Sequence, residues 1–521
     1  MDALADSLKV IADWITQHIT MWALIATGLF LTAVTRGVQV RHLPTMIRQV
    51  ASSRSGARGG ISSFQAFAIS LAARVGVGNV FGVAAALLYG GPGAVFWMWV
   101  VALVGMATAF FEATLAQIFK VRAPDGSFRG GPAFYMARGM GGAGGRVMAG
   151  VFAVITLVTC GFIITSVQSN AVAGTLVAAL GGGEGSALPG FGGLSAAQLV
   201  VAGLVLVLTA VVVFGGIRAV ARVTEWMAPV MALIYIVLVA VVCLLNLGDF
   251  WRVIGRIISS AFAPEPLVGG LGGGVLAAVI NGTKRGLFSN EAGQGTAPNA
   301  AATATVAHPV QQGLIQSLGV FVDTIVVCTA TAFVILIAGP DTWTAPGANP
   351  STLTTLAIAH GLGGWTVLPM AVLIFVLAYS SIIAAYVYTD VNMDYLTGGR
   401  RWASWTVRVV SVASATAGAV LSLDVVWNAV DIAMAVMTLT NLVALIRLHR
   451  WGAGALRDYE DQLRAGAAEP VFRGRDNPRL PGDVPGGVWS SSDDDVTAAD
   501  ADDGSAPAPL AASPAPATTE E

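Results

Sequence analysis

Charged residues are scarce in this chain of 521 residues, where they make up 11% of the sequence against 55% for apolar residues. An ordinary soluble domain carries about a quarter charged residues. The mean hydropathy here is +0.72, and a water-soluble globule of this length could not cover its surface with so few charges. The composition therefore excludes an ordinary soluble protein and predicts a membrane protein.

Cysteine and histidine are also rare. The three cysteines, Cys160, Cys243 and Cys328, lie far apart in apolar segments without metal-ligand spacing, so neither a disulfide framework nor a zinc site is indicated. The five histidines are scattered without i, i+4 pairs, and no serine has a base at a recognisable catalytic spacing. We expect no enzyme, no catalytic residue, no resident metal, no organic cofactor and no nucleic-acid partner.

Long hydrophobic runs, by contrast, recur along the first 446 positions. About eleven of them are long enough for a helix to cross a lipid bilayer's hydrocarbon core. They lie near 19–35, 62–89, 92–118, 147–178, 197–214, 226–246, 268–300, 311–338, 365–395, 403–421 and 425–446. The first run has acidic residues before it and no cleavage site after it, so it does not look like a removable signal peptide. The fold class predicted is an all-α polytopic membrane protein.

Loop charges predict the orientation of this membrane domain, 19–446. If the N-terminus lies outside, the arginine-rich loops lie inside, as the positive-inside rule requires. Residues 1–18 are then an extracytoplasmic segment, and residues 447–521 lie in the cytoplasm of a plasma (bacterial inner) membrane protein. Beyond Ile446 the composition changes to Arg, Asp, Pro, Gly, Ser and Ala, which predicts a disordered tail.

Two runs carry small and polar residues near their middle. The second reads Arg74-Val75-Gly76-Val77-Gly78-Asn79, and the seventh, from Asn281 to Gly295, contains Lys284-Arg285 and Ser289-Asn290-Glu291. Such residues are tolerated in lipid only where the backbone lines an enclosed cavity. The alternatives are helix packing through small residues for the second run and a cytoplasmic loop for the seventh.

The placement of these two runs favours broken helices. Apart from the extra first helix at 19–35, the runs form two groups of five, 62–246 and 268–446, and a broken run opens each group. Because five is odd, the groups have opposite orientations. This pattern is typical of an inverted repeat, in which two discontinuous helices supply a binding site near the middle of the membrane. Their freed N–H groups suit a carboxylate and their freed carbonyls suit a small cation.

The two broken runs and their neighbours resemble the alanine or glycine:cation symporter family, also called sodium:alanine symporters. The matching residues are Asn281 to Ala300, Gly60 to Gly82, Gly90 to Trp99, His308-Pro309-Val310, Gln312-Gly313 and Asp323-Thr324. The resemblance implies a leucine-transporter-type fold and sodium- or proton-coupled symport of a small neutral amino acid such as alanine or glycine into the cell. Its expected partners are that amino acid, a monovalent cation and the lipid bilayer, while the oligomeric state stays open.

The resemblance also implies site residues. The substrate would meet two sets of residues on the broken helices and one on the fourth run, namely Gly76, Val77, Gly78 and Asn79; Asn281, Phe288, Ser289 and Asn290; and Gln168 and Asn170. The hydroxyl pair Ser380 and Ser381 would bind sodium together with a carbonyl at or near Val75. The charged residues of the breaks, Arg74, Lys284, Arg285 and Glu291, would either form internal ion pairs or contact the substrate.

The chain departs from the family pattern after the hydroxyl pair, where Ala385 replaces an expected aromatic residue. A smaller residue at this position could admit a larger neutral amino acid such as glutamine, which is one alternative. The other is an uncoupled facilitator or channel, although a channel would be expected to show a filter rather than paired broken helices. The tail lies outside the resemblance, so removing the residues after Gly466 is expected to leave uptake intact.

Overall fold

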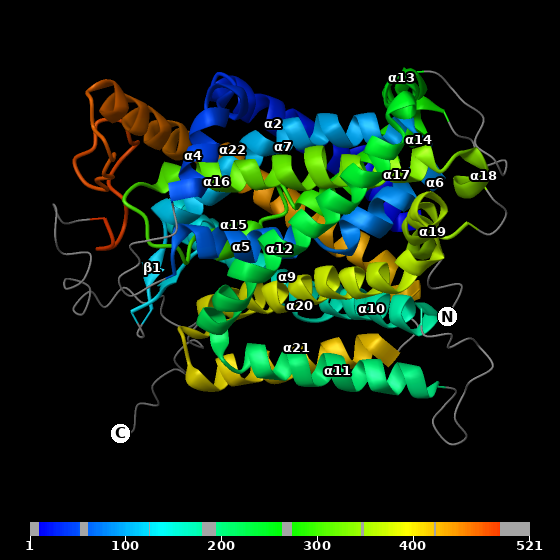
Figure 1. The fold of residues 1–521 in the computed structure, drawn as a ribbon. Coiled ribbons are helices and arrows are strands. Elements are labelled where there is room, and N and C mark those ends of the chain that lie inside the picture. The colour runs from blue at the N-terminus through cyan, green and yellow to red at the C-terminus, as the bar shows by residue number, and fades with distance from the viewer. Residues whose placement is uncertain are drawn as a thin grey trace.

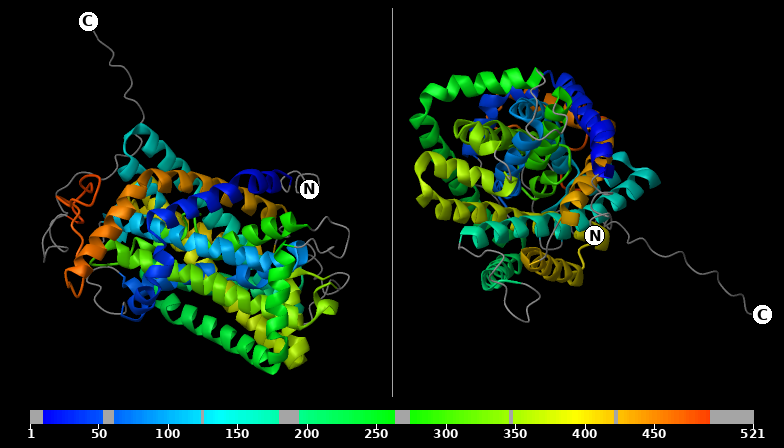
Figure 2. Two further views of the ribbon diagram at one scale, coloured as in Figure 1. Left: turned by 90° about the horizontal axis from the view of Figure 1, so that it is seen from above. Right: turned by 90° about the vertical axis from the view of Figure 1, so that its right-hand side faces the viewer.

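The computed structural model describes residues 10–52, 61–123, 126–179, 194–262, 274–344, 348–420 and 424–489. Long helices run side by side through the molecule (Figure 1), with β1 and the C-terminal part of α22 at one end and α13, α18 and α19 at the other. Figure 2 shows the same bundle along two further directions. The arginine-rich loops lie at the end that carries β1, which is the predicted cytoplasmic end.

The first part of the chain contains the extra helix and the first of the two predicted groups. Its elements are η1 (Thr16–Thr20), α2 (Met21–Val34), α3 (Val38–Arg41), α4 (Leu43–Ser52), α5 (Ser63–Arg74), η2 (Gly78–Gly82), α6 (Val83–Gly90), α7 (Gly93–Ile118), β1 (Val121–Arg122), β2 (Phe128–Arg129), α8 (Pro132–Tyr135), η3 (Met136–Met140), α9 (Gly142–Val158), η4 (Thr159–Ile164), α10 (Thr165–Ala179), α11 (Ala196–Val213), α12 (Gly216–Leu245) and α13 (Leu247–Phe262). The short strands β1 and β2 pair antiparallel.

The second group follows. Its elements are α14 (Val275–Asn290), α15 (Ala297–Ala301), α16 (Pro309–Val320), η5 (Phe321–Cys328), α17 (Thr329–Ile337), α18 (Pro340–Trp343), α19 (Pro350–Leu362), η6 (Gly364–Thr366), α20 (Val367–Thr397), α21 (Arg401–Val420) and α22 (Asp424–Arg464). The segments η1 to η5 are π-helical and η6 is a 3₁₀ turn.

Within the described residues, eight helices are long and apolar enough to cross a membrane, and the bent pair of α5 with η2 and α6 makes up to nine. The predicted count of eleven is therefore not confirmed. The two runs that fall short are 268–300, which is interrupted after Asn290, and 403–421, which forms the less apolar α21. Both breaks nevertheless lie where the sequence predicts them.

Helix packing places both broken helices in the centre of the bundle. The first, α5, packs against α12, α16 and α20, while α14 packs against α6 and α7. The buried core includes Phe110, Phe111, Tyr386 and Tyr388, none of which is more than 1% exposed. At the lipid-facing surface, helices α11 and α12 instead expose large apolar side chains such as Val211 and Trp226, as expected for a bilayer-embedded protein.

Two predicted boundaries differ from the structure. The first described residue, Val10, is already helical, ahead of the predicted start at residue 19, and Asp13 in this helical segment pairs with Lys284. The tail predicted as disordered from residue 447 is helical to Arg464, and residues 465–489 pack against the end of the bundle that carries β1. Trp489, for example, donates its indole N–H to the carbonyl of Gln117 at 3.1 Å. The rest of the tail lies outside the described residues.

Candidate substrate and ion site

The first helix break is built around two glycines. Helix α5 ends at Arg74, η2 begins at Gly78, and the two halves are bent by 46°. A Cβ atom on Gly76 would lie 2.3 Å from Oγ of Ser381, and one on Gly78 would lie 3.1 Å from the ring of Phe288. Only glycine therefore allows this backbone to approach α20 and α14 so closely.

The second break follows α14. Glu291 has a left-handed backbone with φ of 56°, and Gly293 and Gly295 also have positive φ values. Helix α15 then starts at Ala297 after an N-cap at Thr296. Left-handed conformations are disfavoured for residues with a Cβ, so the break is a defined backbone feature that neighbouring contacts must hold in place.

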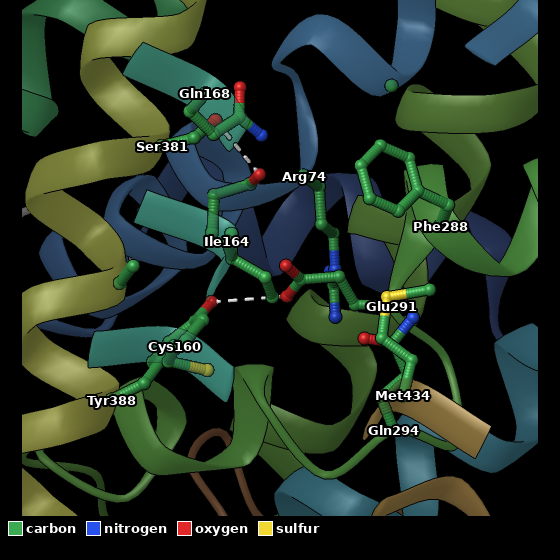
Figure 3. Close-up of a pocket in the computed structure, with 13 residues that line it drawn as sticks. Arg74, Cys160, Ile164, Gln168, Phe288, Glu291, Gln294, Ser381, Tyr388 and Met434 are labelled. Carbon is green, nitrogen blue, oxygen red and sulfur yellow. Dashed lines mark hydrogen bonds between the residues drawn. The ribbon is translucent and has the colours of Figure 1, made fainter. Parts of the chain in front are cut away.

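A cavity lies between the two breaks, and Figure 3 shows its lining. Of the residues predicted from the sequence, Gly78, Gln168, Phe288 and Ser381 line it. The remaining lining residues are Ala73, Arg74, Cys160, Ile164, Glu291, Gln294, Ala385, Tyr388 and Met434. Apolar walls with a few polar groups are typical of a small-molecule site.

The predicted hydroxyl pair meets the end of α5. Ser380 Oγ lies 3.0 Å from the carbonyl oxygen of Ala72. Ser381 Oγ lies 3.0 Å from the same oxygen and 3.1 Å from that of Ala73. The hydroxyls therefore meet carbonyls two and three residues before the predicted Val75, and all of these residues are buried.

Four residues predicted to contact the substrate form hydrogen bonds with other parts of the protein. Asp323, which is fully buried, accepts hydrogen bonds from Nδ2 of Asn79 at 2.6 Å and from Oγ of Ser289 at 2.7 Å. Asn290 donates to Oγ1 of Thr324 at 3.2 Å. Asn281 donates to the carbonyl oxygens of Tyr89 and Ala277 and, like Asn170, does not line the cavity in the described part of the chain.

The freed amides of the second break are also occupied. Glu112 on α7 accepts the N–H of Gly293 at 3.1 Å and that of Gly295 at 2.9 Å. Asn441 on α22 donates to the same carboxylate at 2.6 Å. A carboxylate of the protein therefore binds the backbone of the second break ahead of α15, and Gly78 of the first break lines the cavity. There, the N–H of Val77 donates to Oε1 of Gln168 at 3.4 Å.

Lys284 is one of the charged residues in the seventh run. It pairs with Asp13 and lies 3.8 Å from Asp431, and it does not form an ion pair with Glu291. Arg74 and Glu291 line the cavity instead. The described residues contain no cluster of three His, Cys, Asp or Glu side chains that could hold a metal ion.

Six lining residues were not predicted, namely Ala73, Cys160, Ile164, Gln294, Tyr388 and Met434. A helical spacing in the sequence could have found three of them. Cys160 and Ile164 precede Gln168 at intervals of four on the same helix, and Tyr388 follows Ser381 by seven positions, which places each set on one helix face. Gln294 and Met434 carry no such signal.

Comparisons with known proteins agree on one family. Residues 1–474 match the model of the sodium:alanine symporter family. The amino-acid carrier protein AlsT of Bacillus subtilis is 40% identical over 482 residues, covering 92% of this chain and 97% of that protein. The sodium/alanine symporter AgcS of Methanococcus maripaludis is 36% identical over 434 residues, covering 82% and 90%.

Two further comparisons bear on substrate and fold. A Bacillus subtilis protein described as the probable sodium/glutamine symporter GlnT is 38% identical over 464 residues, covering 88% of this chain and 91% of that protein. The crystal structure of MhsT in complex with L-phenylalanine superposes with a TM-score of 0.53 at 15% identity, covering 76% of this chain and 91% of that chain. The fold is thus the predicted leucine-transporter type.

Proposed function

The chain belongs to the sodium:alanine symporter family, and we propose that it carries alanine or glycine into the cell together with sodium. It is a multi-pass membrane transporter rather than an enzyme. The observation that supports the proposal best is the meeting of Ser380 and Ser381 with the carbonyls of Ala72 and Ala73 beside the cavity.

Sodium binds where these oxygens converge. Hydroxyl and carbonyl oxygens without a carboxylate suit a monovalent ion that must be released in every cycle. The ion takes the place of the hydrogen bonds between the serines and α5, so it joins α20 to the first broken helix. The carbonyl of Val75, one residue beyond Arg74, completes the set of ligands as the backbone turns out of the helix.

The substrate carboxylate binds beside the ion. The N–H groups of the first break face it. That of Gly76 donates to Oδ1 of Asn79 at 3.0 Å and that of Val77 to Oε1 of Gln168 at 3.4 Å. The carboxylate takes the place of these acceptors, with Gly78 and Phe288 beside it in the cavity wall. We place three further predicted residues behind those that contact the substrate. The side chains of Asn79 and Ser289 bind Asp323, and that of Asn290 binds Thr324. Asn281 and Asn170 have weaker support as substrate contacts, since they do not line the cavity.

A larger neutral amino acid such as glutamine is the second candidate substrate. Its support is the small side chain of Ala385 in the cavity wall, together with the 38% identity to GlnT. The orientation we propose places the N-terminus outside and the C-terminus in the cytoplasm of the plasma membrane, and the arginine-rich loops support it.

Uptake of radiolabelled alanine into proteoliposomes tests the function. We expect accumulation when an inward sodium gradient is imposed, competition by unlabelled glycine, and loss of accumulation in Ser381→Ala. Competition by glutamine but not glycine would favour the second candidate. Equilibration without any gradient would contradict coupled transport and indicate a facilitator.

A further inference from the structure

Three carboxylates are buried at the centre of the membrane domain. Glu112, Glu291 and Asp323 are 1%, 7% and 0% exposed. Arg74 is the positive charge that acts on all three. If every carboxylate were ionised, three negative charges would face one positive charge, and uncompensated charge inside a membrane costs several kcal/mol. A further positive charge would therefore stabilise this cluster once water has left the site.

Hydrogen bonds distinguish the three carboxylates. Glu112 accepts from Gly293, Gly295 and Asn441. Asp323 accepts from Asn79, Ser289 and Thr324. Sets of three donors stabilise a buried carboxylate in its ionised form. Donors of the protein therefore already surround these two groups.

Glu291 has fewer donors and faces the cavity. Its Oε2 accepts from Oγ1 of Thr296 at 2.8 Å and from the hydroxyl of Tyr388 at 3.4 Å, a long contact that is visible in Figure 3. Both donors approach the same oxygen. Of the three carboxylates, Glu291 alone lines the cavity, so it is the one that a ligand can reach.

Arg74 also has unused hydrogen-bonding capacity. Its Nη1 donates to the carbonyl of Gln316 at 3.1 Å, while Nε and Nη2, both buried, have no hydrogen-bond partner. Within the described residues no ion pair joins Arg74 to Glu291. The guanidinium and the carboxylate thus both enter the same cavity with groups left unpaired.

We propose that Glu291 binds a proton that is carried together with the amino acid. This inference rests on the proposed function. In the empty cavity the free N–H groups of Arg74 can turn toward the ionised Glu291. A substrate carboxylate at the neighbouring first break competes for the same N–H groups, and Glu291 then loses its compensating charge.

A proton on Glu291 removes the negative charge that Arg74 no longer compensates. It comes from the outer aqueous phase and forms an O–H bond on the Glu291 carboxylate as the cavity closes and water leaves, because an enclosed neutral carboxyl costs less than an enclosed anion. It is released as hydrated H⁺ when the cavity opens to the cytoplasm and water returns. No bond other than this O–H bond is made or broken.

A proton suits this position better than a second metal ion. The charged or titratable groups facing Glu291 are Arg74 from α5, Asp323 from η5, Cys160 from η4 and Tyr388 from α20. Arg74 would repel a sodium ion, and a sodium site needs several converging oxygens. A proton needs one oxygen only, and Oε1 of Glu291 has no donor among the contacts described above.

Proteoliposomes loaded with a pH-sensitive dye test the proposal. Alanine added under an inward sodium gradient, with the membrane voltage clamped, should acidify the lumen containing wild-type protein. Glu291→Gln should abolish the alanine-dependent acidification, while alanine exchange across the membrane without gradients persists. Glu291→Asp should restore acidification, and Asp249→Asn, in an exposed ion pair with Arg252, should leave it unchanged.

Three outcomes would overturn the proposal. Sodium-driven alanine uptake by the wild type without acidification would refute proton transport and leave the proposed function intact. Persisting acidification in Glu291→Gln would assign the proton to another group. Equal loss of exchange and acidification in that variant would show that Glu291 has a structural role and does not carry the proton. Absence of any alanine uptake by the wild type would instead refute the proposed function.

Discussion

Gly76 stands at the point where the first broken helix touches the hydroxyl pair. The closeness of the contact depends on a missing side chain, since a Cβ atom there would be 2.3 Å from Oγ of Ser381. This distance is shorter than any normal contact. An alanine would therefore displace the hydroxyl from the carbonyls of Ala72 and Ala73, which are the proposed sodium ligands.

Gly76→Ala should raise the sodium concentration for half-maximal alanine uptake by about tenfold, equivalent to about 1.4 kcal/mol of lost ion binding. The measurement is uptake at graded sodium concentrations in proteoliposomes. Gly150→Ala is the matched control, because a Cβ atom on Gly150 would meet nothing within 4 Å. Equal sodium dependence in the two variants would contradict this account of the ion site.

The sequence predicted several residues that line the cavity, but not the contacts of the other predicted residues. Gly78, Gln168, Phe288 and Ser381 line the cavity. Asn79 and Ser289 were also predicted as substrate contacts, but their side chains bind Asp323. A sequence shows that an amide or hydroxyl lies near a break, but which partner it meets depends on the packing of distant helices.

Each of the two helix breaks is held by a carboxylate from another helix. Asp323 of η5 binds side chains from both broken helices. Glu112 of α7 binds the backbone of the second break. Buried N–H groups without a partner cost about 1–3 kcal/mol each, so these contacts stabilise a backbone that would otherwise be unfavourable in lipid.

Glu112→Ala should lower the thermal stability of the detergent-purified protein. Loss of the carboxylate leaves the N–H groups of Gly293 and Gly295 and the amide of Asn441 without this acceptor, at a cost of about 3 kcal/mol in unfolding free energy. Thermal unfolding followed by tryptophan fluorescence would measure a fall in Tm of several degrees. Asp249→Ala, at an exposed position, serves as the comparison, and an equal Tm in both variants would show that Glu112 does not hold the break.

At the scale of the whole molecule, the C-terminal segment 465–489 covers part of the end of the bundle that carries β1. The backbone N–H of Phe472 donates to the carbonyl of Ala307, and Lys120 lies 4.8 Å from the ring of Trp489. His308, beneath this segment, accepts the N–H of Val310 and contacts Asp458. Burial lowers the pKa of His308, which keeps the ring neutral and able to accept that N–H.

Removal of the residues after Gly466 should therefore reduce the amount of folded, active transporter, contrary to the expectation from composition alone. Truncation after Trp489 retains these contacts and should preserve uptake. Fluorescence-detected gel filtration and alanine uptake, measured on both truncations, would compare them. Wild-type behaviour of the shorter protein would show that the packed segment is dispensable.

Hydropathy predicted the bundle, and small, polar and charged residues within two runs predicted the two breaks, because lipid restricts a chain to few arrangements. They did not predict the order of residues 465–489, since a polar, Gly- and Pro-rich segment can pack on a folded surface through a few anchors such as Phe472 and Trp489. They also placed the start of the first helix too late, since Val10 is already helical, and they did not predict the pairing of Asp13 with Lys284, far apart in the sequence.

The most direct test of sodium-coupled alanine symport is the alanine-dependent entry of radioactive sodium into proteoliposomes, with wild-type protein and Ser381→Ala compared at equal reconstitution. Our account predicts that sodium enters the wild-type vesicles only when alanine is supplied, and that the variant abolishes this entry. Alanine uptake by the wild type without accompanying sodium entry would contradict it.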